Sequence, residues 1–292
     1  MSRTVSATDV LAGVDFDGPA PPRWWPGDPF NSIQVTPGRV IVIGAPPAAG
    51  KTALIGQLTT QLLQLNPELK LLTCNVEMTP TELLLRQLSR LSGVELSKIT
   101  DRAMTPEERK HLDSGRETGQ AVFERMHFLK PPFHFGNIKQ AVGEHESELV
   151  VIDYIQRFAP SPATDAAKNA DSRRALDLMM NEVREVATWG ACVFVISAVA
   201  RQKSASGASG YGGLNMASLR GSSELEYGAD SAYLLTRERR SEFAVMECVK
   251  NRNGEEVDIP LRFSGAVQLF TKGEPFDGYD EAVPLPAKGK KL

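Results

Sequence analysis

An apolar run that leads directly into a turn rich in glycine, lysine and threonine constrains this chain more than any other feature. The run is Val40–Ile43, and the turn ends in Gly50, Lys51 and Thr52. A β-branched strand that enters such a turn and continues into a helical pattern is the arrangement of a nucleotide phosphate-binding loop. Gly50 allows the backbone to approach phosphate oxygens, Lys51 can reach the β- and γ-phosphates, and the Thr52 hydroxyl can ligate Mg²⁺. The segment therefore predicts that the chain binds ATP or a related nucleoside triphosphate.

The loop departs from the usual pattern at one place, because an alanine stands where its first glycine is expected. Ala45 occupies that position, and Gly44 lies one residue early. The alternative is a chance Gly-Lys-Thr sequence in a surface turn, and the strand before and the helix after argue against it. We expect the nucleotide to contact Ala45, Pro46, Pro47, Ala48, Ala49, Gly50, Lys51 and Thr52.

Beyond this loop, short apolar runs alternate with helical patterns. Leu69–Cys74, Leu149–Ile152 and Ala191–Ser197 are apolar on both faces, which is typical of strands in a parallel sheet. Thr79 and Thr105 each precede a proline and stand three residues before a glutamate, so each starts a helix with a capping box. These patterns predict an α/β fold in which a sheet with a parallel core has helices on both faces.

The C-terminal part changes character. Extended segments at 232–236, 243–249, 256–263 and 266–270 are separated by turn residues, which predicts an antiparallel extension of the sheet. We therefore expect one domain over residues 36–271, followed by a loop-like tail over residues 272–292.

The N-terminal residues are rich in proline, glycine and aspartate, and we expect residues 1–35 to form an arm or linker rather than part of the core. Trp24 and Trp25 can dock on the arm's own domain or on a neighbouring subunit. Docking on the own domain is favoured, since exposed tryptophan pairs are rare in monomers.

Composition excludes several classes of protein. The net charge of −3 argues against a surface that coats nucleic acid throughout, although it leaves room for a local basic groove. No apolar run approaches the ~20 residues needed to span a bilayer, and no stretch suits a signal peptide, so no membrane partner is expected. The three cysteines are solitary and the four histidines lack metal-site spacing, which favours a reducing, cytoplasmic location and no structural metal.

Two carboxylates follow predicted strands. Asp153 ends the strand at 149–152, where the carboxyl edge of a parallel sheet faces the ligand crevice, so with Thr52 it can hold Mg²⁺. The alternative is an aspartate that caps a turn. Glu77 follows the strand that ends at Cys74, and no arginine or lysine close in sequence neutralises it. It is the best candidate to orient a hydrolytic water, with a plain surface glutamate as the alternative.

Five segments follow one another in a recognisable order. They are Ala45–Thr52, Glu77–Pro80 with Leu83 and Arg86, Val151–Gln156, Leu219–Ser222 with Glu226, Ala229 and Asp230, and Lys250–Gly254. In this order they resemble the C-terminal ATPase domain of the DnaB-type replicative helicases, a branch of the RecA-like motor fold. The resemblance extends over residues 36–270, and the second, third and fifth segments together are fairly specific. That family also lacks a glycine at the place of Ala45.

The resemblance implies an ATP-hydrolysing DNA helicase motor in DNA replication, with ATP held between subunits of a ring such as a hexamer. Lys250 and Arg252 match the family's lysine and arginine fingers, which reach the γ-phosphate bound by the next subunit. Without the resemblance, they read as exposed basic residues beside an Asn-Gly turn. Arg86 joins the nucleotide-binding set, and Lys51 and Glu77 complete the catalytic set.

Two departures from the family matter. Ala198 stands where the family usually carries a glutamine that senses the γ-phosphate. The family also has an N-terminal helical domain, whereas only a short segment precedes the motor here. We therefore do not expect primase or loader binding, or a stable hexamer, to carry over from the family.

Single-stranded DNA is the expected partner, and the loop at 201–220 is its most plausible contact. Arg201, Lys203 and Arg220 supply charge that can neutralise phosphates, and the glycines between them let the backbone follow a strand. The alternative is a linker with incidental charge. Two other functions stay open, namely a RecA-like ATPase switch and a recombination or loading factor that binds nucleotide and DNA without unwinding.

Overall fold

The computed structural model describes residues 4–14, 17–161, 172–199, 202–203, 209–210, 218–219, 223–237 and 241–274. The elements in these ranges are α1 (Ala7–Ala12), β1 (Val40–Ala45), α2 (Lys51–Leu65), β2 (Leu71–Asn75), α3 (Pro80–Ser92), α4 (Leu96–Thr100), α5 (Pro106–Phe123), β3 (Met126–Phe128), α6 (Phe135–His145), β4 (Leu149–Asp153), η1 (Ile155–Arg157), α8 (Ser172–Thr188), β5 (Cys192–Ala198), β6 (Gln202–Lys203), β7 (Ser209–Gly210), α9 (Ser223–Gly228), β8 (Ser231–Arg237), β9 (Phe243–Asn251), β10 (Ile259–Ser264) and β11 (Leu269–Lys272).

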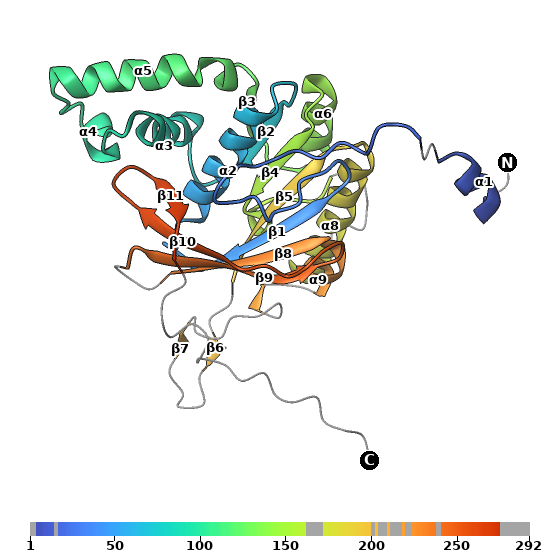
Figure 1. Cartoon of the computed structure of the whole chain (residues 1–292). Coiled ribbons are helices and arrows are strands. Elements are labelled where there is room, and N and C mark those ends of the chain that lie inside the picture. Colours follow the sequence, from blue (N-terminus) through green and yellow to red (C-terminus); the bar gives the residue numbers. More distant parts are fainter. Residues whose placement is uncertain are drawn as a thin grey trace.

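A nine-stranded mixed sheet organises the chain, in the order β11-β10-β9-β8-β1-β5-β4-β2-β3 (Figure 1). The strands from β8 to β3 pair in parallel, whereas β9, β10 and β11 are joined to the sheet by antiparallel pairing. The predicted parallel core is confirmed, and so is an antiparallel C-terminal extension, which consists of β9, β10 and β11. The segment at 232–236, expected in that extension, lies in β8 and pairs in parallel with β1. This mixed sheet is the one expected for the RecA-like fold.

Helices cover both faces of the sheet. Alternate side chains of each strand point to opposite sides, so an apolar strand presents apolar side chains to the helices on both faces. In β1, Ile41 and Ile43 pack with the buried leucines of α2, whereas Val40 and Val42 belong to a second cluster with residues of α6 and α8. The carboxyl ends of β1, β2, β4 and β5 therefore share one edge, directly beside the start of α2.

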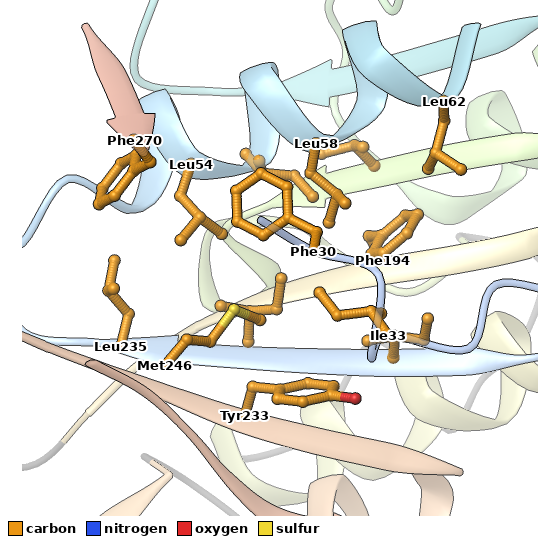
Figure 2. Packing of buried hydrophobic residues seen from close by; sticks show 14 of the residues in the cluster. Phe30, Ile33, Leu54, Leu58, Leu62, Phe194, Tyr233, Leu235, Met246 and Phe270 are labelled. Atoms are coloured by element: carbon orange, nitrogen blue, oxygen red, sulfur yellow. The ribbon is translucent and has the colours of Figure 1, made fainter. Parts of the chain in front are cut away.

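Part of the N-terminal segment lies in the core, which differs from the expectation of an arm. Figure 2 shows Phe30 and Ile33 between α2 and the sheet, and both are essentially fully buried. Burying a phenylalanine side chain stabilises a fold by about 1.5–3 kcal/mol. Trp24 also packs against its own domain, as favoured above, whereas Trp25 is 53% exposed and lies against Arg23. By contrast, α1 buries none of its residues.

The two predicted capping boxes are present. Thr79 and Thr105 each accept the backbone N–H three residues on, and Glu82 and Glu108 bond back to them. The sequence did not predict β3, α4 or α6, which are short or begin without a typical cap. Among the residues described, no helix is both long enough and apolar enough to cross a membrane.

Candidate nucleotide-binding site

The predicted phosphate loop connects β1 to α2, as the sequence pattern requires (Figure 1). Gly50 stands at the N-cap of α2 with φ of 101°, a left-handed conformation that favours glycine, and no side chain caps the helix there. Ala48 also has a positive φ, of 64°. The uncapped N–H groups of a helix start, with Lys51 as its first residue, form a site suited to an anion such as phosphate.

Behind this loop, the carboxylate of Asp153 is the centre of a polar cluster. Its Oδ2 atom accepts hydrogen bonds from Thr52 Oγ1 at 3.1 Å and from Asn75 Nδ2 at 2.9 Å. Its Oδ1 atom is buried and has no hydrogen-bond partner among the residues that the structure describes. Burial raises the pKa of Asp153, while the nearby charge of Lys51 and the bond from Thr52 act in the opposite direction.

This donor set fits a hard divalent cation. A carboxylate oxygen and a threonine hydroxyl are ligands that Mg²⁺ prefers, and an orphaned buried oxygen is stabilised when it binds a cation. Thr52 and Asp153, the two residues expected to hold Mg²⁺, are brought together by the structure. A metal bound here would shield the charge of the phosphates.

Glu77 lies on the same edge, two residues after the end of β2. Its carboxylate is 3.5 Å from Lys51 Nζ, so a lysine that is distant in sequence neutralises it, although none is close in sequence. The side chain of Glu77 is 39% exposed, which places it at the mouth of the site rather than in the core. Lys51 also lies over the ring of Tyr154.

Arg86 lies on α3, behind the polar cluster centred on Asp153. It lines a cavity of about 30 Å³ that Thr52, Asn75 and Asp153 also line. Its Nη1 donates a short hydrogen bond to Gln268 in the turn before β11, while its Nε is buried without a partner within the described part of the chain. Arg86 is therefore near the predicted nucleotide, with its guanidinium directed to a neighbouring turn.

Lys250 and Arg252 lie at the opposite end of the sheet. Ser231 of β8 pairs with Ile41 at the beginning of β1 and with Asn251 at the end of β9. The phosphate loop leaves the other end of β1, four residues further on, which corresponds to roughly 13 Å of strand. Figure 1 shows α9 near the end at which β1 begins, away from the turn into α2. Neither basic residue can meet the phosphate loop of its own chain.

The side chains of Lys250 and Arg252 both make hydrogen bonds at this end of the sheet. Lys250 Nζ donates to the carbonyl of Glu226 at 2.5 Å, and burial, followed by the charge of Arg252, lowers the pKa of Lys250. Arg252 Nη1 donates to Asp230 Oδ1 at 3.3 Å, and its side chain is 53% exposed. Arg252 can therefore reach outward to a neighbouring molecule.

The carboxylate of Asp230 binds several residues at this end of the sheet. Its carboxylate forms a two-point ion pair with Arg184 of α8 at 2.8 and 3.2 Å and accepts the Val40 N–H at 2.9 Å. Burial alone raises the pKa of Asp230, but the bonds from Arg184 and Val40 and the charge of Arg252 outweigh it and lower the pKa overall. The sequence pointed to Asp230 only through the family resemblance, and it did not point to Arg184.

Ala198 ends β5 directly beside Ala45 at the end of β1. Its backbone N–H donates to Gln156 Oε1 at 3.3 Å, and Gln156 Nε2 donates to Ser197 Oγ at 2.8 Å. A glutamine side chain is therefore present at this edge, supplied by η1 instead of by position 198.

The predicted DNA-contacting residues are only partly within the described ranges. Arg201 and Arg220 lie outside them, and only the backbone of Lys203 is described, in β6 paired with β7. Val199 forms a bridge with Leu219, so the loop leaves and rejoins the fold beside the end of β5.

Arg237 is a residue that sequence reasoning missed. It ends β8 at the edge that carries the phosphate loop, and its Nη2 donates to the Ala48 carbonyl at 2.7 Å. Its guanidinium also lies over the ring of Phe263. The sequence does show a basic residue just after the predicted strand at 232–236. It does not show that this strand, β8, pairs in parallel with β1 and so brings Arg237 to the phosphate loop.

The chain matches a family model and is similar to curated proteins. The model of the DnaB-like helicase C terminal domain matches residues 33–272. Two curated relatives, both named DNA repair protein RadA, come from Halalkalibacterium halodurans (23% identical) and Listeria monocytogenes (22% identical). Each alignment covers 83% of this chain and 43% of the relative, so the chain spans less than half the length of these relatives.

Solved structures share the fold. One of them, described as an ATPase domain, superposes with a TM-score of 0.69 at 19% identity, over 82% of this chain and 86% of that chain. A DnaB-like replicative helicase, described together with its interactions with primase, gives a TM-score of 0.70 at 18% identity, over 82% of this chain and 58% of that one. Because the family model covers most of the chain, this protein belongs to the DnaB-like helicase C-terminal domain family.

Proposed function

We propose that this protein is an ATP-hydrolysing, helicase-like motor that acts on single-stranded DNA during DNA replication, with ATP bound between the subunits of a ring. One observation carries the proposal, namely the division of the site between two ends of the sheet. The phosphate loop and the acidic residues occupy one end, and the exposed Arg252 occupies the other. Only a second copy of the chain can bring Arg252 to the phosphate loop, and a head-to-tail contact of this kind forms a ring where its rotation closes.

Each residue has a specific role in this proposal. The loop residues and Lys51 bind the phosphates, and Thr52 and Asp153 hold Mg²⁺, which would neutralise charge on the β- and γ-phosphates. Glu77 orients the attacking water and accepts its proton. Lys250 and Arg252 of the neighbouring subunit stabilise the charge on the transferred phosphoryl group. Arg86 supports the nucleotide site from behind.

Arg201, Lys203 and Arg220 are proposed to contact the DNA backbone. The bridge between Val199 and Leu219 supports this assignment, because it starts and ends the loop beside Ala198 and the phosphate loop. The three cysteines are buried and unpaired, which supports a reducing, cytoplasmic location.

A second candidate is a RecA-like ATPase switch or a recombination factor that binds nucleotide and DNA without unwinding. The similarity to proteins named DNA repair protein RadA favours it, as does the alanine at position 198.

The test is the ATPase rate with and without single-stranded DNA, followed by mass measurement with nucleotide present. The salt concentration is held fixed, because phosphate contacts are salt-sensitive. A motor should show stimulation by DNA, a ring-sized mass, and strand separation on a forked duplex. Stimulation and assembly without strand separation would instead support the second candidate.

A further inference from the structure

Asn75, the last residue of β2, links two parts of the proposed active site. It is 8% exposed and stands directly beside Asp153 in the parallel register of β2 and β4. Its amide nitrogen donates to Asp153 Oδ2 at 2.9 Å, and its amide oxygen accepts the backbone N–H groups of Glu77 at 2.9 Å and Met78 at 2.7 Å. One side chain thus touches both the cation-binding carboxylate and the segment that carries Glu77.

The contact with Asp153 fixes the orientation of that carboxylate. Oδ2 receives two donors, Asn75 Nδ2 and Thr52 Oγ1, whereas Oδ1 has none within the described residues. A carboxylate held in this way presents one defined oxygen to a cation instead of rotating between the two. Partners that orient a ligand in this manner commonly change metal affinity by about 10–100-fold.

The contacts with Glu77 and Met78 form an Asx turn, in which an asparagine side chain accepts N–H groups two and three residues on. The turn fixes the backbone between the end of β2 and the capping box at Thr79. It therefore sets the position from which the Glu77 carboxylate reaches the site.

Asparagine suits this place because it has both a donor and an acceptor. A serine hydroxyl can still cap the turn, although more weakly, but it is too short to reach Asp153 in the same way. An alanine can make neither contact. The two functions of the side chain can therefore be separated by substitution.

We infer that Asn75 is a positioning residue that couples the cation-binding carboxylate of Asp153 to the placement of Glu77. This inference rests on the roles proposed above for Asp153 and Glu77. It goes beyond them because it assigns one residue the joint alignment of the cation and of the attacking water.

The experiment compares Asn75→Ala, Asn75→Ser and a matched control, Asn66→Ala. Asn66 is also 8% exposed and bonded through its amide, but it contacts Trp25 and Leu62 instead of the site. The first readout is binding of a fluorescent ADP analogue, measured in EDTA and then as a titration with Mg²⁺. The second is the ATPase kcat at saturating Mg²⁺.

Both Asn75 variants should weaken the Mg²⁺ dependence of analogue binding by about 10-fold or more, with unchanged affinity in EDTA. Asn75→Ala should also lower kcat by about 10-fold or more, and Asn75→Ser should recover most of that loss because it retains the turn. Asn66→Ala should behave as the unmodified protein in both assays. Asn75→Ser also serves as the milder variant if Asn75→Ala does not fold.

Unchanged Mg²⁺ dependence in both folded Asn75 variants would overturn the link to Asp153. Equal kcat losses in the Ala and Ser variants would overturn the link to Glu77. If the unmodified protein itself showed no Mg²⁺-dependent binding or turnover, the proposed function would fail instead, so the two failures are distinguishable.

Discussion

Replacement of Gly50 by alanine should destabilise the protein more than the same change at Gly190. The two glycines have nearly the same backbone, with φ of 101° and 99°. An added Cβ at Gly50 would lie 3.0 Å from Phe270 Cζ and 3.4 Å from Phe263 Cε1, whereas at Gly190 no heavy atom of the described residues lies within 4 Å. Gly190 stands in the turn before β5, away from the phosphate loop. The pair therefore separates backbone strain from steric contact.

The magnitude follows from these two terms. A left-handed backbone costs a non-glycine residue about 1–2 kcal/mol, and this term applies to both variants. Overpacking against the stacked rings of Phe263 and Phe270 adds about 1–3 kcal/mol at Gly50 alone. We expect a loss in the free energy of unfolding of about 2–5 kcal/mol for Gly50→Ala and about 1–2 kcal/mol for Gly190→Ala.

Urea unfolding of both variants measures the difference, and binding of a fluorescent nucleotide measures its consequence. Gly50→Ala should lower nucleotide affinity by about 10-fold or more, since the loop backbone must shift where it approaches phosphate. Gly190→Ala should bind like the unmodified protein. Equal destabilisation of the two variants together with unchanged affinity would refute the assignment of Gly50 to a close backbone approach.

Three further predictions concern single side chains. Glu77→Gln should keep ATP binding but lower the hydrolysis rate by about 100-fold, because it preserves shape and removes the proton acceptor; normal turnover would show that another group orients the water. Ala198→Gln should increase stimulation of the ATPase by single-stranded DNA more than it changes the basal rate, since the alanine methyl has no hydrogen-bonding atom; strong stimulation of the unmodified protein would show that coupling runs through another residue. Asp230→Asn should reduce the free energy of unfolding by about 1–3 kcal/mol at pH 7, because Arg184 loses its charged partner. The folded-state pKa of Asp230 is lowered, so its contribution to stability is fully present above the unfolded pKa of about 3.9. The difference between the two proteins should be lost as the pH falls through the lower folded-state pKa.

Much of the fold could be predicted because its signals are local. The loop at Gly50, the strand that ends at Asp153 and the capping boxes at Thr79 and Thr105 each lie within a few consecutive residues. Parallel pairing then brings Thr52 and Asp153 to one edge, as the position of Asp153 at a strand end suggested.

The remaining features depend on contacts between residues far apart in sequence. Arg237 and Ala48 are separated by 189 positions, and their contact requires β8 to lie beside β1, which no local pattern indicates. The ion pair between Lys51 and Glu77 likewise depends on the order of the strands. Phe30 appeared to be part of an arm because proline-rich composition reports backbone preference and not the final packing of one aromatic side chain.

We propose that ATP is hydrolysed between two copies of the chain, with the phosphate loop of one and Arg252 of the other. The most direct measurement mixes Lys51→Ala with Arg252→Ala, two variants that should each be nearly inactive alone. In randomly mixed rings with equal amounts of each, about one quarter of interfaces would combine an intact loop with an intact arginine. We predict that the mixture regains ATPase activity up to about that fraction of the unmodified rate. No regained activity, with mixed assembly confirmed by native mass measurement, would contradict the claim.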